Sequence, residues 1–262
     1  MTINAYTRIA ANAARTTLAH RVGFVLGTFG ATFQLVAMVA LWTALLKRGA
    51  YLGGFSLDQM KAYLIVGYIT GVLGTALGEQ VMSDRIRSGD VAIDLVRPLD
   101  YQGMRFAEVL GGMCVEIILV VIVGTTFWMV AGPVSAPAQP ALFAISLVAV
   151  LPIKFLIFYM STLLCFWTQN YHGVAWARSA LSLILSGALV PLALLPHWLQ
   201  TLSNLLPFAS ITSTPALIFA GRADPGHSQE LILVQSAWVA ILWFAGRLAW
   251  RGAVRQLTVH GG

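Results

Sequence analysis

The residues that could do chemistry in this sequence are few, and they form no recognisable catalytic motif. Its three lysines, Lys47, Lys61 and Lys154, have no glycine before them and no serine or threonine after them. The phosphate-binding Walker loop is therefore missing. No nucleophile, base and orienting group form a local motif, and the five histidines lack the spacing of metal ligands. We expect no catalytic residue, no metal and no cofactor bound by this chain.

Two cysteines and two charged residues lie inside long apolar runs. Cys114 and Cys165 fit neither a disulfide framework nor a metal site, so we interpret both as small buried hydrophobes. Glu116 and Lys154 are unusual, because a charge in mid-membrane costs about 2.5–3.5 kcal/mol on insertion scales. The short connection 133–140 places the two at similar depth on antiparallel helices. An ion pair between them is predicted, either to fix helix register or to act on a substrate or proton.

Composition and the lengths of the apolar runs indicate an integral membrane protein. Charged residues make up 10% of the chain and hydrophobic residues 58%, whereas soluble domains carry roughly 25% and 45–50%. About 20 apolar residues cross the ~30 Å hydrocarbon core as a helix, and a β-barrel would show alternation instead. We predict an all-α fold with about six transmembrane helices, near residues 22–46, 58–78, 108–132, 141–167, 179–196 and 231–250.

The arginines and lysines set the expected orientation. Cytoplasmic loops carry an excess of Lys and Arg, and an N-terminus inside the cell places most of these residues on the inner side. The inner set is Arg8, Arg15, Arg21, Arg85, Arg87, Arg97, Arg105, Arg178, Arg247, Arg251 and Arg255, and the outer set is Lys47, Arg48, Lys61 and Arg222. Both termini are therefore predicted to be cytoplasmic.

Residues 1–21 are predicted to form an interfacial helix that lies on the inner leaflet. At helical spacing, four polar residues share one face and a weakly apolar group shares the other. The polar face holds Asn4, Arg8, Asn12 and Arg15, and the apolar face holds Tyr6, Ile9, Ala10 and Ala13. A partly ordered tail is the alternative. The remaining chain is interpreted as one membrane domain, 22–250, and a cytoplasmic tail, 251–262.

Glycines recur along the second predicted span. Gly67, Gly71, Gly74 and Gly78 fall at positions i, i+4, i+7 and i+11. Small residues at this spacing let two helices approach closely. Two interpretations stay open, which are close helix packing and a translocation path that opens and closes.

The segment 79–100 combines charges of both signs with a short amphipathic pattern. Gly89 is placed to end one helix and Asp90 to cap the next, which would stop near Pro98. One face is expected to be buried and the other outward, with Ile86, Val91 and Leu95 on the first and Asp90, Asp94 and Arg97 on the second. The segment is either a solvated connecting loop or a protein-docking surface.

The segment 197–230 is not a simple loop. Pro207, Pro215 and Pro225 interrupt it, yet it keeps apolar stretches such as 216–220. Short helices that dip into the outer interface of the membrane would satisfy both observations.

Three stretches, taken in order, resemble permease subunits of the type-2 ATP-binding-cassette transporters (the ABC-2 class). The sequence Ile86-Arg-Ser-Gly-Asp-Val-Ala-Ile-Asp-Leu-Val-Arg-Pro-Leu99 is similar to the I-x-x-G … L-x-x-P-L segment of that family. Residues 53–63 (GGFSLDQMKAY), before the second span, and 206–221 (LPFASITSTPALIFAG), before the sixth, are similar in content and position. The resemblance covers nearly the whole chain.

The resemblance implies a six-helix permease that pairs with a second permease copy or a homologue above two separate ATPase subunits, which bind ATP and Mg. The segment between spans two and three would be the coupling helix, which sits in a cleft of the ATPase. The short outer helices would be re-entrant and close an outer gate. The matching residues are Arg85, Ile86, Arg87, Gly89, Asp90, Asp94, Leu95, Arg97 and Pro98 for ATPase coupling, and Pro207, Phe208 and Pro215 for the gate.

The leading hypothesis is a permease subunit that exports an amphipathic drug-like compound, lipid or glycan across a bacterial inner membrane by alternating access. One alternative is a secondary transporter or channel that works without ATP, and another is a non-transporting membrane scaffold. Asp94→Arg or Arg97→Glu is expected to abolish stimulation of the ATPase while leaving the permease folded.

Overall fold

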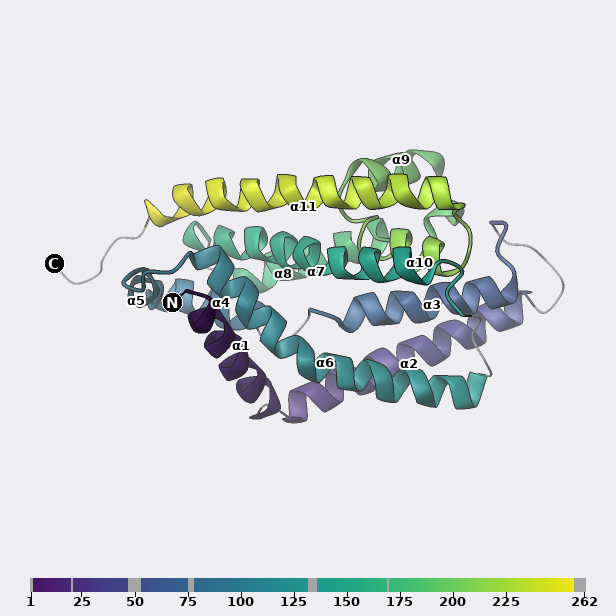
Figure 1. Cartoon of the computed structure of the whole chain (residues 1–262), viewed down its shortest axis with the longest axis horizontal. Helices are drawn as coiled ribbons and strands as arrows, with labels where there is room; N and C mark the ends of the chain where they lie inside the picture. Colours follow the sequence, from purple (N-terminus) through teal and green to yellow (C-terminus); the bar gives the residue numbers. More distant parts are fainter. Residues whose placement is uncertain are drawn as a thin grey trace.

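The computed structural model is all-α in the residues that it describes, which are 2–19, 21–46, 53–74, 78–131, 136–168 and 170–256. The longer helices are α1 (Thr2–Ala19), α2 (Arg21–Leu46), α3 (Leu57–Val72), α6 (Tyr101–Ala131), α7 (Pro140–Leu163), α8 (Tyr171–Leu185) and α11 (Pro225–Val254). The shorter elements are α4 (Gly78–Ser88), α5 (Val91–Leu95), α9 (His197–Leu205), α10 (Ser213–Phe219) and the 3₁₀ turns η1 (Leu164–Phe166) and η2 (Leu192–Leu194). Most long helices follow the long axis of the molecule, whereas α1 is inclined to that axis and lies beside the first half of α6 (Figure 1).

Within the described ranges, length and composition mark three helices as able to cross a membrane. They are Tyr101–Thr125, Pro140–Phe166 and Pro225–Val254, and the shorter apolar helix Thr32–Leu46 joins them. The all-α prediction is confirmed for the described residues. The count of six spans and the domain limits stay predictions.

Two of the predicted spans differ from the helices observed. The second, predicted over 58–78, ends as α3 at Val72, because Gly74 takes a left-handed conformation with φ of 77°. The fifth, predicted over 179–196, begins at Tyr171 and ends at Leu185, two residues before the left-handed Gly187. Glycine adopts this backbone region at little cost and therefore commonly ends helices.

The buried side chains form two separate cores. The inner core joins α4, α5, α7, α11 and the first half of α6, and includes Met82, Ile86, Val91, Tyr101, Met104, Ile153, Phe155, Leu156, Tyr159 and Leu242. The outer core joins α2, α3, α10 and the end of α6, and includes Leu35, Val39, Phe55, Met60, Tyr63, Val66, Val123, Phe127 and Ala216. The names follow the expected orientation, with α5 at the inner end.

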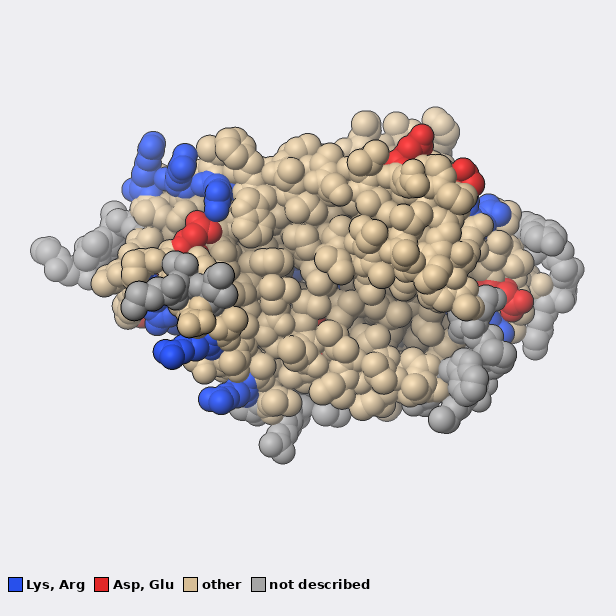
Figure 2. Space-filling model, viewed as in Figure 1, with Lys and Arg blue, Asp and Glu red and all other residues tan. Residues whose placement is uncertain are grey.

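Charged side chains gather at the two ends of the molecule, and the middle of the visible face is almost free of them (Figure 2). The N-terminal end of α1, the C-terminal end of α11 and α5 lie at the same end (Figure 1). Exposed arginines at the end of α11 and directly after it, among them Arg251 and Arg255, lie there too. This arrangement agrees with the orientation expected from the sequence, and the cytoplasmic placement of that end stays a prediction.

The helix α1 packs along α6, with Tyr6 and Ile9 against the inner core. The contact is close, because a Cβ atom on Gly111 would lie 2.0 Å from the carbonyl oxygen of Ala10. The predicted polar face is exposed, as its members Asn4, Arg8, Asn12 and Arg15 are all at the surface. The two faces are therefore assigned as predicted, and the position of α1 on the inner leaflet stays a prediction.

One of the two cysteines is not buried. Cys165 is buried as predicted, whereas Cys114 is exposed on α6. It shares its face with exposed apolar side chains at helical spacing, which are Leu110, Ile117, Ile118 and Val121. An apolar run alone does not distinguish a residue that faces hydrocarbon from one that faces the protein interior.

Candidate functional site

The segment 79–100, predicted as a docking surface, folds into α4, a tight turn and α5. Gly89 ends α4 with φ of 82°, and its N–H donates to the carbonyl oxygen of Ile86 over 3.3 Å. The prediction for Gly89 is confirmed. Asp90 precedes α5 as predicted, but its side chain makes no capping hydrogen bond and instead accepts from the Ser88 hydroxyl over 2.9 Å.

The predicted orientation of α5 is wrong at two positions. Ile86 and Val91 are buried as expected, whereas Asp94, predicted outward, is only 4% exposed. Leu95, predicted to be buried, is 44% exposed. The reason is electrostatic, because two arginines draw the Asp94 carboxylate inward and turn the helix with it.

These charges form an inner clamp, which we define as Arg85, Asp94, Arg105 and Glu108. Arg85 donates to both Asp94 oxygens, from Nε over 2.9 Å and from Nη2 over 2.8 Å. Arg105 contacts the same carboxylate and donates to Glu108 over 2.7 Å. The side chains of Arg105 and Asp94 are 3% and 1% exposed. The clamp therefore ties α4 and α5 to the start of α6 through a bidentate ion pair, Arg85–Asp94, and a fully buried one, Arg105–Asp94.

The inner clamp continues into the helix bundle through aromatic rings. The Arg105 guanidinium lies 4.8 Å from the centroid of the Tyr101 ring. Tyr101 in turn stacks on Trp250 of α11 with centroids 3.9 Å apart and an interplanar angle of 3°. Sequence reasoning missed Arg105, whose only signal is an arginine at the start of an apolar run, 11 residues after Asp94.

Three apolar side chains remain at the surface next to the inner clamp. Ile93, Leu95 and Val96 are 59%, 44% and 84% exposed, and we call them the coupling tip. Arg97 and Pro98 follow and are exposed as well. Exposed apolar clusters typically mark a contact with another protein or with the membrane.

The glycine row of the second predicted span is divided between several environments. A Cβ atom on Gly67 would meet Thr212 at 3.6 Å, so this glycine packs against the outer segment. Gly71 and Gly74 have open space around them, and Gly78 begins α4. The four glycines therefore do not lie on one continuous helix.

Glu116 and Lys154 both reach the C-terminal end of α3. Lys154 donates to the carbonyl oxygens of α3, and Glu116 accepts from the N–H of Gly74 over 2.6 Å. The predicted similar depth of the two residues agrees with this shared destination. The direct ion pair between them stays a prediction.

A second charged pair joins α4 to α8. Arg178 donates to Glu79 over 2.8 Å, and the two side chains are 21% and 22% exposed. Burial raises the pKa of the Glu79 carboxyl above its usual range, and the neighbouring Arg178 opposes this rise. The pair attaches the start of α4 to α8, the helix of the fifth predicted span.

The two outer segments that resemble the family lie side by side. The Tyr63 hydroxyl donates to the carbonyl oxygen of Gly187 over 2.9 Å, and the hydroxyls of Thr70 and Thr212 are 3.1 Å apart. Arg222 donates to the carbonyl oxygen of Gly54 over 2.7 Å and lies over the Phe55 ring. These bonds flank a direct contact, because α3 packs against α10 and Phe55, Tyr63 and Ala216 share the outer core. The stretches 53–63 and 206–221 therefore form one outer structure.

The three predicted gate residues lie in the outer structure. Pro207 and Pro215 are buried and Phe208 is half-buried. Every residue from 209 to 216 is buried, and α10 packs against α3, α7 and α11. The short helices α9 and α10 confirm the prediction of proline-broken helices in this segment.

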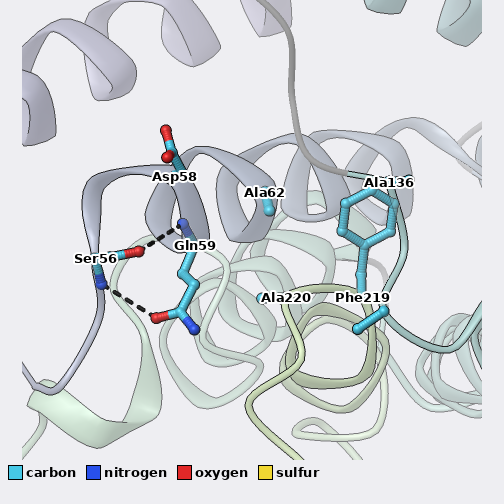
Figure 3. Close-up of a pocket in the computed structure, with 8 residues that line it drawn as sticks. Ser56, Asp58, Gln59, Ala62, Ala136, Phe219 and Ala220 are labelled. Atoms are coloured by element: carbon cyan, nitrogen blue, oxygen red, sulfur yellow. Dashed lines mark hydrogen bonds between the residues drawn. The ribbon is translucent and has the colours of Figure 1, made fainter.

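A cleft opens beside the outer structure. Figure 3 shows the Ser56 and Gln59 side chains bonded to the backbone at the start of α3, with the Phe219 ring at the opposite side. The volume of the cleft is about 280 Å³. The lining residues are Ser56, Asp58, Gln59, Ala62, Ala136, Ala138, Phe219 and Ala220. The cleft lies between the two outer segments.

A family model described as ABC-2 family transporter protein matches residues 32–261. A comparison with curated proteins gave no match. The matched range contains the inner clamp, the coupling tip and both outer segments. The chain belongs to the ABC-2 family and is the multi-pass membrane permease component of an ABC transporter, which works with ABC ATPase subunits.

Proposed function

We propose that this chain is one of two permease subunits that stand above two ATPase subunits, which bind ATP and Mg. In this proposal the complex exports an amphipathic substrate, which is a drug-like compound, a lipid or a glycan, across a bacterial inner membrane by alternating access. The family assignment supports the permease role, and the apolar walls of the bundle suit an amphipathic substrate.

The coupling tip is the observation that carries the proposal. Its three apolar side chains stand exposed at the end of the molecule where the arginines gather. Charged Arg87, Asp90 and Arg97 surround it, and all three are exposed. An apolar centre with a charged rim is the composition of a protein interface. We assign its partner as a cleft on the ATPase subunit.

The inner clamp gives the coupling tip a mechanical connection. Asp94 lies between Ile93 and Leu95, so displacement of the tip moves a carboxylate that two arginines hold. Arg105 stands on α6, and its neighbour Tyr101 stacks on α11. A push on the tip is therefore transmitted to two long helices. In this role Asp94 is a positioning residue and makes no contact with the ATPase.

At the opposite end we assign the outer gate to the segment that contains Pro207, Phe208 and Pro215. Burial of residues 209–216 between three helices supports this assignment, since a plug must fill the path that it closes. A Cβ atom on Gly71 would meet no other atom within 4 Å. We therefore assign this glycine of the row to the translocation path.

The test uses the permease purified together with its ATPase. Arg97→Glu and Val96→Asp are expected to reduce co-purification of the ATPase and to remove the difference in ATP hydrolysis between the complex and the free ATPase. Arg255→Glu is the matched control, because it makes the same charge change on an exposed arginine of the same end. The measurements are the stoichiometry by native mass and the rate of hydrolysis.

Retention of the ATPase and of coupled hydrolysis by both variants would show that the coupling tip is not the docking surface. Transport by the purified chain without an ATPase, driven by an ion gradient, would favour the secondary transporter. Asp94→Arg is not a suitable test of docking, because Asp94 is buried between two arginines and its replacement disturbs folding.

A further inference from the structure

The second predicted span is interrupted inside the molecule. The helix α3 has 16 residues, which at ~1.5 Å per residue is about 24 Å, less than the ~30 Å hydrocarbon core. Its last carbonyl groups therefore end at membrane depth and not in bulk water. Each unsatisfied backbone group in hydrocarbon costs several kcal/mol, so a protein donor is required at this position.

Lys154 of α7 is that donor. Its Nζ atom donates to the carbonyl oxygens of Thr70 over 2.6 Å and Gly71 over 3.0 Å, and also to that of Leu73. An ammonium group has three donors and no acceptor, so all of them are engaged. The C-terminal end of a helix carries partial negative charge, which a cation stabilises. The three carbonyl oxygens thus form a cation site that a tethered ammonium fills.

Glu116 of α6 contacts the same end of α3 from the amide side. Its carboxylate accepts from the Gly74 N–H over 2.6 Å, and its side chain is fully buried. A cation and an anion from two different helices therefore hold one helix end. We call Lys154, Glu116 and the backbone of 70–74 the middle clamp.

The middle clamp lies between the two cores. The neighbours of Lys154 in sequence, Ile153 and Phe155, belong to the inner core. Its ammonium group nevertheless contacts the backbone of Thr70, whose hydroxyl is paired with Thr212 of the outer structure. Lys154 is thus a polar connection between the inner core, which lies next to the coupling tip, and α3, which packs against the gate segment.

We propose that the carbonyl oxygens at the end of α3 form an intramembrane site for a primary ammonium ion, filled by Lys154, and that this contact carries movement from the inner core to the outer gate. The proposal rests on the permease function described above. Lys154 is a positioning residue in this scheme, and it contacts neither the substrate nor the ATPase.

The experiment measures the outer gate directly in the reconstituted permease–ATPase complex. Ala220→Cys, in a background with Cys114→Ser and Cys165→Ser, reports gate movement through its labelling rate by a membrane-impermeant maleimide, with and without ATP. Lys154→Ala is expected to reduce the ATP-dependent change in labelling about tenfold, as for loss of a typical coupling free energy. The matched control is Lys61→Ala, which removes a lysine from α3 outside the middle clamp.

Chemical rescue separates an ammonium site from a merely structural lysine. Ethylammonium ions added to Lys154→Ala are expected to restore the ATP-dependent change, whereas ethanol, which is neutral and similar in size, is not. Lys154→Arg keeps the charge, but a planar guanidinium cannot direct three donors from one nitrogen to the three carbonyl oxygens, so an intermediate response is expected. This variant also keeps the test informative if Lys154→Ala fails to assemble.

Two results would overturn the proposal, namely a wild-type response in Lys154→Ala or Lys154→Arg, or equal rescue by ethanol and ethylammonium. Failure of the wild-type chain to bind an ATPase is a different result, because it contradicts the proposed function and leaves no complex to assay. The two failures are thus distinguished by the stoichiometry of the purified sample.

Discussion

The inner clamp and the middle clamp both contain buried charged side chains, but the partners of these side chains differ. In the inner clamp a buried carboxylate faces two guanidinium groups, so charge is balanced by charge. In the middle clamp Lys154 and Glu116 contact backbone carbonyl and amide groups at one helix end. The first arrangement holds side chains of three helices together. The second provides hydrogen-bond partners for the backbone groups at the end of α3, which ends inside the membrane. The comparison indicates that opposite charges neutralise one another in the first, whereas the backbone groups of a helix end stabilise the charged groups in the second.

The largest expected effect is at Asp94. Asp94→Ala leaves the buried Arg105 with Glu108 as its remaining carboxylate and removes the carboxylate that Arg85 binds, and breaking one partner out of a buried pair costs about 3–5 kcal/mol. The control is Asp84→Ala, because Asp84 and Arg87 are 3.9 Å apart and their side chains are 61% and 40% exposed. That exposed pair contributes roughly 0–1 kcal/mol. Thermal unfolding in detergent measures both, and equal shifts would contradict the buried clamp.

Glu116 tests whether the middle clamp depends on an acceptor rather than on charge. Glu116→Gln keeps an oxygen that accepts from the Gly74 N–H, whereas Glu116→Ala removes it and costs about 1–3 kcal/mol for the unsatisfied amide. The glutamine variant is therefore expected to unfold at a higher temperature than the alanine variant. If the two variants unfold together, charge and not the hydrogen bond holds this end of α3.

The smallest effect is expected from the glycines of the middle clamp. Gly74→Ala forces a side chain into the left-handed region at about 1–2 kcal/mol. Gly71→Ala lies within α3 and is expected to be neutral or to stabilise by up to about 1 kcal/mol. Both positions have open space for a Cβ atom, so backbone conformation alone separates them. A lower unfolding temperature for Gly74→Ala, with an unchanged or higher one for Gly71→Ala, would confirm that α3 ends between these residues. Equal shifts in the two variants would contradict it.

Much of the fold follows from composition and glycine placement. The apolar runs predict helices close to α2, α6 and α7, because about 20 apolar residues can hardly fold otherwise in lipid. Gly89 was identifiable as a helix end, since it stands between two amphipathic patterns. The faces of α1 were likewise visible in the spacing of Asn4, Arg8, Asn12 and Arg15.

The two clamps were harder to predict, for physical reasons that differ. Asp94 was assigned outward because a short helix gives too few turns to separate a polar face from a buried ion pair. The early end of α3 was missed because Gly74 belongs to a row of glycines that also suits helix packing. The partners of Lys154 are backbone carbonyl groups, which every residue carries and which leave no pattern in the sequence.

The close contact between Ala10 and Gly111 joins two segments that are synthesised at different times. A nascent chain grows at about 5–20 residues per second, so α1 emerges roughly 5–20 s before the glycine that receives it. During that interval its apolar face, with Tyr6 and Ile9, has no protein partner. The water–lipid boundary is the surface that such an amphipathic helix fits meanwhile. The helix α1 is thus made well before the residue that receives it.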